Sequence, residues 1–94
     1  MATIPLQPVG MPHDHSRTDA IYGFDARGVA KRFRHAAIFG ALDSLQPGET
    51  MRFVNDHDPI PLLHQMIDRY GDQGIQISYL QRDMDGVVID FLRK

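Results

Sequence analysis

Apolar and polar residues alternate in four stretches of the chain, and this period of two predicts four β-strands. The strands are expected at Tyr22–Phe24, at Met51–Val54, at Ile75–Tyr79 and at Val87–Phe91. Between the last two stands Asp83-Met84-Asp85-Gly86, which carries the Asp-Gly pair typical of a hairpin. The fourth strand is therefore expected to run antiparallel to the third.

Two stretches between the strands have apolar residues at every third or fourth position, which predicts two amphipathic helices. The first is expected from about Arg32 to Leu45, followed by Pro47-Gly48, a pair typical of a type II turn. The second follows Asp58, a residue suited to cap a helix N-terminus, and Pro59, which the first helical position tolerates. The apolar stripe of the second helix comprises Leu62, Leu63, Met66, Ile67 and Tyr70.

The order of these elements, βαβαββ, predicts an α+β two-layer sandwich. Two helices are expected to cover one face of a mixed four-stranded sheet. Residues 1–20 contain three prolines and show neither period, so an N-terminal arm or tail is expected there. Residues 21–94 are expected to form a single domain.

Composition narrows the classes of function. A formal net charge of −2 gives no overall attraction to nucleic acid or to an anionic membrane, and no apolar run approaches the roughly 18 residues of a membrane span. The absence of cysteine excludes disulfides, thiolate metal sites and cysteine nucleophiles. Glycine-rich phosphate loops and a nucleophile elbow are absent too. Since the first residues lack the basic start of a signal peptide, a cytoplasmic location is expected.

Several short sequences, taken together, resemble those of a known superfamily. They are FDARG at 24–28, Arg34-His35, LQPGE at 45–49 and NDHDP-x-PL at 55–62. The chain resembles the TusA/SirA sulfur-carrier superfamily over residues 22–94, and more narrowly its uncharacterised domain-of-unknown-function 2249 branch. The resemblance implies that the first two strands are adjacent and parallel, so that both helix N-termini lie at one edge of a TusA/SirA-like sheet.

The same resemblance also limits the function. Sulfur carriers begin the first helix with a Cys-Pro pair whose cysteine carries a persulfide, whereas this chain has no cysteine. Persulfide transfer is therefore excluded, and only the scaffold can be shared. Members of the branch often occur beside hemerythrin-like iron-binding domains, so the resemblance implies a role near metal or redox biology.

The sequence VNDHDPIP at 54–61 has two interpretations. In the first, His57 lies near His35 and, with Asp56 or Asp58, completes a ligand set for zinc, non-haem iron or haem. In the second, Asp58 caps the helix, and Asn55 or Asp56 bonds the backbone of its own loop. The second interpretation leaves the identity of His57 unexplained. It therefore becomes a candidate residue for binding a partner.

The start of the first predicted helix is unusually cationic. It carries Arg27, Lys31, Arg32, Arg34 and His35. Because the N-terminal end of a helix dipole is already positive, this arrangement favours a nearby negative charge. Either the acidic residues of the 55–58 loop supply it, or the helix amides and arginines bind a small anion.

Phe39 lies on the helical wheel away from the apolar stripe and on the same face as Arg32 and His35. This position fits an interaction surface, or an apolar side chain that the N-terminal arm covers.

The favoured interpretation is a non-enzymatic binding domain. It would use the edge formed by residues 27–35 and 55–58 to bind a partner protein, such as a hemerythrin-like or redox protein, or a small anion. The alternative is a metal- or haem-binding protein with His35 and His57 as ligands. Nucleic-acid binding is disfavoured, because no surface of aromatic and basic side chains is predicted.

Overall fold

The computed structural model describes residues 20–94 and contains the predicted elements in the predicted order. They are β1 (Ile21–Asp25), the short 3₁₀ turn η1 (Ala26–Gly28), α1 (Lys31–Asp43), β2 (Thr50–Asn55), α2 (Ile60–Tyr70), β3 (Ile75–Asp83) and β4 (Gly86–Arg93). The predicted arm at residues 1–20 lies, apart from its last residue, outside the described residues.

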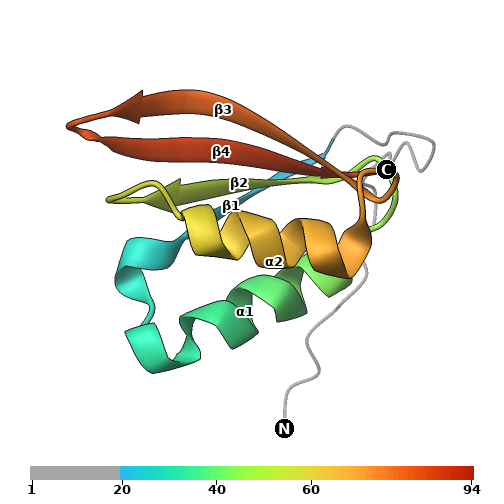
Figure 1. The fold of residues 1–94 in the computed structure, drawn as a ribbon, viewed down its shortest axis with the longest axis horizontal. Coiled ribbons are helices and arrows are strands. Elements are labelled where there is room, and N and C mark those ends of the chain that lie inside the picture. Colours follow the sequence, from blue (N-terminus) through green and yellow to red (C-terminus); the bar gives the residue numbers. More distant parts are fainter. Residues whose placement is uncertain (1–19) are drawn as a thin grey trace, which may run out of the picture.

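The four strands form one sheet in the order β1-β2-β4-β3. β1 and β2 are parallel, while β4 is antiparallel to both of its neighbours. Figure 1 shows both helices on the same face of this sheet. The α+β two-layer sandwich predicted from the sequence is confirmed, and the C-terminal ends of β1 and β2 meet at one edge.

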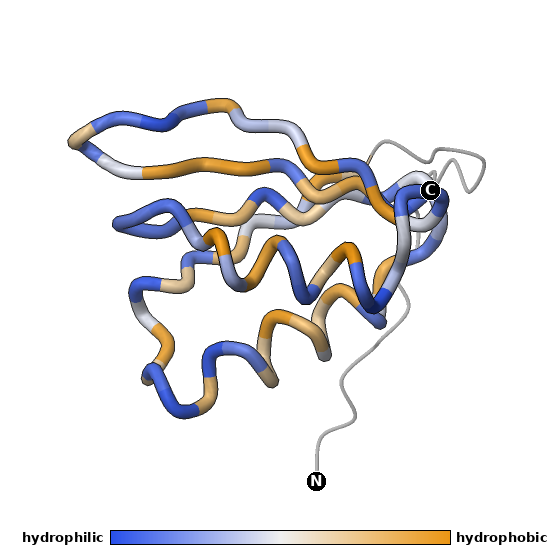
Figure 2. The backbone as a smooth tube through the Cα atoms, viewed as in Figure 1, coloured by the Kyte–Doolittle hydropathy of each residue, from blue (hydrophilic) through white to orange (hydrophobic). Residues whose placement is uncertain are grey.

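The core lies between the sheet and the helices, and alternating strand residues supply most of it. The buried apolar residues are Ala26, Ile38, Leu42, Met51, Phe53, Leu62, Met66, Ile75, Val87, Ile89 and Phe91. In Figure 2 the hydrophobic colour runs along β4 and recurs on the sides of the helices that face the sheet. At the centre the rings of Phe53 and Phe91 lie 5.4 Å apart.

Two glycines allow the turns that follow the helices. Gly48 in the turn after α1 has φ 90°, and Gly71 ends α2 with φ 73°. Both values lie where side chains with a Cβ are strained, so each turn depends on its glycine.

The hairpin is longer than its apolar alternation predicts. β3 continues to Asp83, past a bulge between Tyr79 and Gln81 that leaves Leu80 half exposed. A bulge inserts one residue and breaks the period of two, which explains why the pattern ends early. Neither helix of residues 20–94 is long and apolar enough to cross a bilayer.

Candidate functional site

A cavity of about 300 Å³ opens where the end of β2 meets the first turns of α1 and α2. Its lining residues are Lys31, Arg34, His35, Ile38, Phe53, Asn55, His57, Pro59, Pro61 and Leu62. We call it the cationic cavity, because its charged lining side chains are basic and none is acidic. Its size is at the lower end of the range for small-molecule sites.

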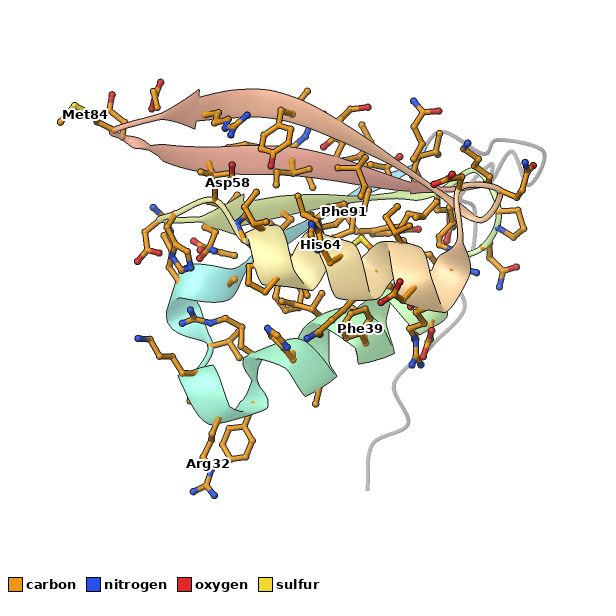
Figure 3. All side chains as sticks on the ribbon, viewed as in Figure 1. Arg32, Phe39, Asp58, His64, Met84 and Phe91 are labelled. Carbon is orange, nitrogen blue, oxygen red and sulfur yellow. The ribbon has the colours of Figure 1, made fainter. Side chains whose placement is uncertain are left out.

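The cationic wall comes from one face of α1. Lys31, Arg34 and His35 stand three and four residues apart, a spacing that aligns side chains on a helix. Arg32 falls on another face, where its guanidinium lies 5.6 Å from the ring centre of the exposed Phe33. Figure 3 shows Arg32 pointing away from the rest of the molecule. Arg32, predicted as a site residue, therefore does not line the cavity.

Arg34 is held in place without a carboxylate. Its Nε and Nη2 donate to the carbonyl oxygen of Val29 at 3.1 and 2.7 Å. Among residues 20–94, neither Arg34 nor Lys31 forms an ion pair. The first turn of α1 also has no acidic residue and no side-chain cap. The positive end of the helix dipole therefore coincides with two cations that have no ion-pair partner within residues 20–94.

Arg27 has a partner that the sequence analysis did not assign to it. The Asp25 carboxylate accepts bonds from Arg27 Nε and Nη2 at 2.9 and 2.7 Å, and from its backbone N–H at 3.0 Å. These contacts with Arg27, the side-chain hydrogen bonds above all, lower the pKa of Asp25 to about 2. Arg27 therefore pairs with Asp25, and it does not line the cationic cavity.

The pair of Asp25 and Arg27 predicts an acid-dependent stability. Because folding lowers the pKa of Asp25 from 3.8 to about 2, the ionised carboxylate stabilises the fold above about pH 4, and this contribution is lost as the pH falls toward 2. Asp25→Asn keeps an acceptor but removes the charge. We expect it to lower the urea midpoint at pH 6 and to show a much smaller deficit at pH 2. The control Asp68→Asn removes an exposed carboxylate that forms no ion pair within residues 20–94, so it should change the midpoint little at pH 6. An equal deficit of Asp25→Asn at both pH values would contradict the prediction.

Asn55 contributes the buried polar group of the cavity. It is the last residue of β2, is 2% exposed, and its Nδ2 donates to the carbonyl oxygen of His57 at 3.0 Å. Its Oδ1 is buried, and no donor of residues 20–94 bonds to it. Buried polar atoms rarely lack a hydrogen-bond partner, and within residues 20–94 only Asp58 Oδ2 shares this condition among the buried side-chain oxygens and nitrogens.

Asp56 and His57 form a pair at the rim. Asp56 Oδ1 lies 2.6 Å from His57 Nδ1, and both side chains are mostly exposed. The hydrogen bond to His57 is the main cause of the lowered pKa of Asp56, and the charge of Arg34 adds a smaller effect. The predicted neutralisation of α1 by the acidic loop is therefore limited to Asp56 acting at a distance.

The prediction that Asp58 caps α2 is wrong. α2 begins at Ile60 without a side-chain cap. The Asp58 carboxylate instead accepts a hydrogen bond from Tyr79 Oη, and its Oδ2 lies 2.9 Å from Arg82 Nε. Figure 3 places Asp58 on the side of the loop toward the β3–β4 hairpin. Two partners on a neighbouring strand thus replace the expected bonds to the helix amides.

The same contacts separate Asp58 from His35 and His57 in the predicted metal set. Asp58 binds the hairpin, whereas the two histidines line the cavity. Nowhere in residues 20–94 do three His, Cys, Asp or Glu side chains gather as a metal site would require. The ligand set proposed from the sequence is therefore not assembled.

Phe39 does not stand exposed on the surface of α1. It is half-buried against the core, and its ring centre lies 6.4 Å from those of His35 and Tyr70 and 5.4 Å from the guanidinium of Arg69. Figure 3 shows it between the two helices. The aromatic side chain that α1 does expose is Phe33, 60% accessible.

Several cavity residues were not among the predicted site residues. Lys31 could have been found from its spacing to Arg34 and His35. Pro59, Pro61 and Leu62 could not, because their role depends on how α2 packs beside β2. Of the predicted residues, Arg34, His35, Asn55 and His57 come together at the cavity.

The part of the chain that forms the cationic cavity matches a known protein family. The model of the family described as "Uncharacterized conserved protein (DUF2249)" matches residues 23–93, a range that includes every residue lining the cationic cavity. No curated protein and no solved structure matches the chain.

Proposed function

We propose that this chain, which belongs to the DUF2249 family of uncharacterized conserved proteins, is a binding module that holds a small anion in the cationic cavity. The observation that carries the proposal is that Lys31 and Arg34, which form no ion pair within residues 20–94, line a cavity at the N-terminal end of α1. An anion is favoured over a cation, because no carboxylate lines the cavity.

The two walls of the cavity contribute unequally to anion binding. Lys31 and Arg34 stand at the N-terminal end of α1, where roughly half a positive charge of the helix dipole adds to theirs. The opposite wall offers little to an anion, since proline has no N–H and Ile60 donates its own to the carbonyl of Asp58. Ile38, Phe53 and Leu62 supply apolar surface to the floor. The geometry thus suits a compact anion held from the α1 side.

A protein partner, for which a hemerythrin-like or redox protein is the candidate implied by the resemblance, stays a prediction. No contact among residues 20–94 favours one partner, and none favours a bound metal or haem.

Neutralising the α1 wall should weaken anion binding. Using isothermal titration calorimetry with hydrogen phosphate and with lactate, we expect Arg34→Gln to raise the Kd about 10- to 100-fold. This range corresponds to the loss of a charge-assisted hydrogen bond of about 1.5–3 kcal/mol. Lys31→Gln should also raise the Kd, and it leaves the bonds between Arg34 and Val29 intact.

Arg32→Gln is the matched control. It removes the same charge from the same turn of α1, but on a face away from the cavity. If it weakens binding as much as Arg34→Gln does, the anion responds to overall charge and the site is wrong. Failure of both anions to bind at millimolar concentration would overturn the proposed function.

A further inference from the structure

We infer that residues 1–11 fold back along β1 and pack in an apolar groove between β1 and α1, so that the chain covers its own edge strand. This surface is separate from the cationic cavity, and the inference does not depend on anion binding. It is supported by the groove itself, by the sequence that precedes residues 20–94, and by the place where that sequence joins β1.

The apolar groove has a volume of about 460 Å³, larger than that of the cationic cavity. Its apolar lining residues are Tyr22, Phe24, Ala41, Leu45 and Met51. Because Tyr22 pairs with the buried Met51 of β2, both side chains point to the face of the sheet that the helices cover. Tyr22 is nevertheless 51% exposed, so within residues 20–94 this part of the face is incompletely covered.

β1 is also the less protected edge of the sheet. Within residues 20–94 it pairs only with β2, without a bulge, and its one charged residue, Asp25, is paired with Arg27. The opposite edge, β3, has a bulge and ends in the charged residues Arg82 and Asp83. Edge strands are protected from pairing with other chains by charges, by bulges or by a covering segment. For β1, a covering segment is the device that remains.

The sequence before β1 divides into an apolar and a polar part. Residues 1–11, MATIPLQPVGM, have no charged side chain and include Ile4, Leu6, Val9 and Met11. Residues 12–19, PHDHSRTD, are polar apart from Pro12. Since burying apolar surface is favourable, the first part is suited to fill an apolar groove and the second to cross the surface as a connection.

The prolines of the apolar part indicate how it would bind. Pro5 and Pro8 have no N–H and favour an extended backbone, so the segment packs through its side chains and does not add a regular strand to β1. Proline-rich segments bind in grooves lined by aromatic rings, and Tyr22 and Phe24 provide such rings here.

The point of attachment brings the apolar part within reach of the groove. The carbonyl oxygen of Ala20 accepts a hydrogen bond from the N–H of Thr50 at 2.9 Å, so this residue is held beside β2. Tyr22 of the groove follows two residues later. Residues 12–19 can extend over about 27 Å, whereas β1 spans about 17 Å. They can therefore reverse the chain and return residues 4–9 alongside β1.

Paramagnetic broadening in NMR spectra tests this inference on the full chain. Because the chain has no cysteine, Gln7→Cys gives a single attachment site for a nitroxide. We expect the amide signals of Gly23, Ala41 and Leu45 to lose most of their intensity. The control is a nitroxide on Met84→Cys, at the hairpin tip beside the end of β2 remote from the groove, which should leave these signals sharp (Figure 3).

A tethered segment broadens nearby signals even when it is not bound, so two charge variants of the nitroxide-labelled Gln7→Cys chain are compared. Leu6→Asp places a charge in the apolar part and should restore much of the intensity of Ala41 and Leu45. Ser16→Asp adds the same charge to the polar part and should leave the broadening unchanged. Equal broadening in both variants would overturn the inference, and so would sharp groove signals in the labelled Gln7→Cys chain.

A mixed sample shows which copy fills the groove. One copy carries the nitroxide without ¹⁵N, and the other carries ¹⁵N without the nitroxide. Sharp groove signals in this mixture support packing within one chain. Broadened signals would assign the groove to residues 1–11 of a second copy and would overturn the inference.

Discussion

Replacing Phe91 by alanine is expected to lower the free energy of unfolding by about 3–5 kcal/mol, the usual cost of removing a buried phenyl ring. Phe91 is 0% exposed, lies on a central strand and packs against the ring of Phe53 at 5.4 Å. Figure 3 shows it between the sheet and α2. Since a small domain is stable by only about 5–15 kcal/mol, this single change would remove a large part of its stability. Urea denaturation followed by circular dichroism measures the difference.

Phe33→Ala is the matched control for this change. The same atoms are removed from a side chain that is 60% exposed, so its effect should stay within about 0.5 kcal/mol. Comparable losses for Phe91→Ala and Phe33→Ala would mean that the assignment of core and surface is wrong.

Gly74→Ala is expected to destabilise the fold by about 1–3 kcal/mol, the range for an overpacked site. A Cβ at this position would lie 2.4 Å from the carbonyl oxygen of Tyr70 and 3.3 Å from its Cβ, so the backbone must move. Tyr70 packs beside Phe39, and its hydroxyl donates to Asp43 at 2.6 Å. A shift there would therefore disturb the contact between the two helices, which a lowered thermal midpoint would report.

Gly40→Ala, in contrast to Gly74→Ala, is expected to stabilise the fold. A Cβ on this exposed residue in the interior of α1 meets nothing within 4 Å, and alanine favours a helix over glycine by about 0.5–1 kcal/mol. We expect this variant to be more stable than the unmodified chain. A Gly74→Ala variant that is equally stabilised would show that the end of α2 is not as close to Gly74 as the structure has it.

The candidate site was only partly predictable, and Asp58 illustrates the limit. Asp58 followed by Pro59 has the local sequence of a helix cap. Such a pattern takes account only of the backbone N–H groups close to Asp58 in the chain. Tyr79 and Arg82 compete for the same carboxylate from a strand more than twenty residues away. The sequence around Asp58 does not show that these distant side chains will bind its carboxylate.

Phe39 shows the same limit on α1, whereas Lys31 does not. The helical wheel placed Phe39 off the apolar stripe, but it could not show that Tyr70 and Arg69 of α2 would pack on that flank. The spacing of Lys31, Arg34 and His35 does predict the face of α1 that lines the cavity, because side chains three and four residues apart align on any helix.

The sequence by itself determined the order of the elements, the face that each one buries, and the turn that depends on Gly48. These follow from the period of apolar residues and from the steric freedom of single residues, both of which are local. Only the tertiary structure decided that β4 lies between β2 and β3, that Asp58 binds the hairpin, and that Asn55 and His57 line one cavity with the cationic face of α1. Each of these depends on contacts between segments far apart in the chain. A local sequence pattern does not show which of several possible long-range contacts is the most stable.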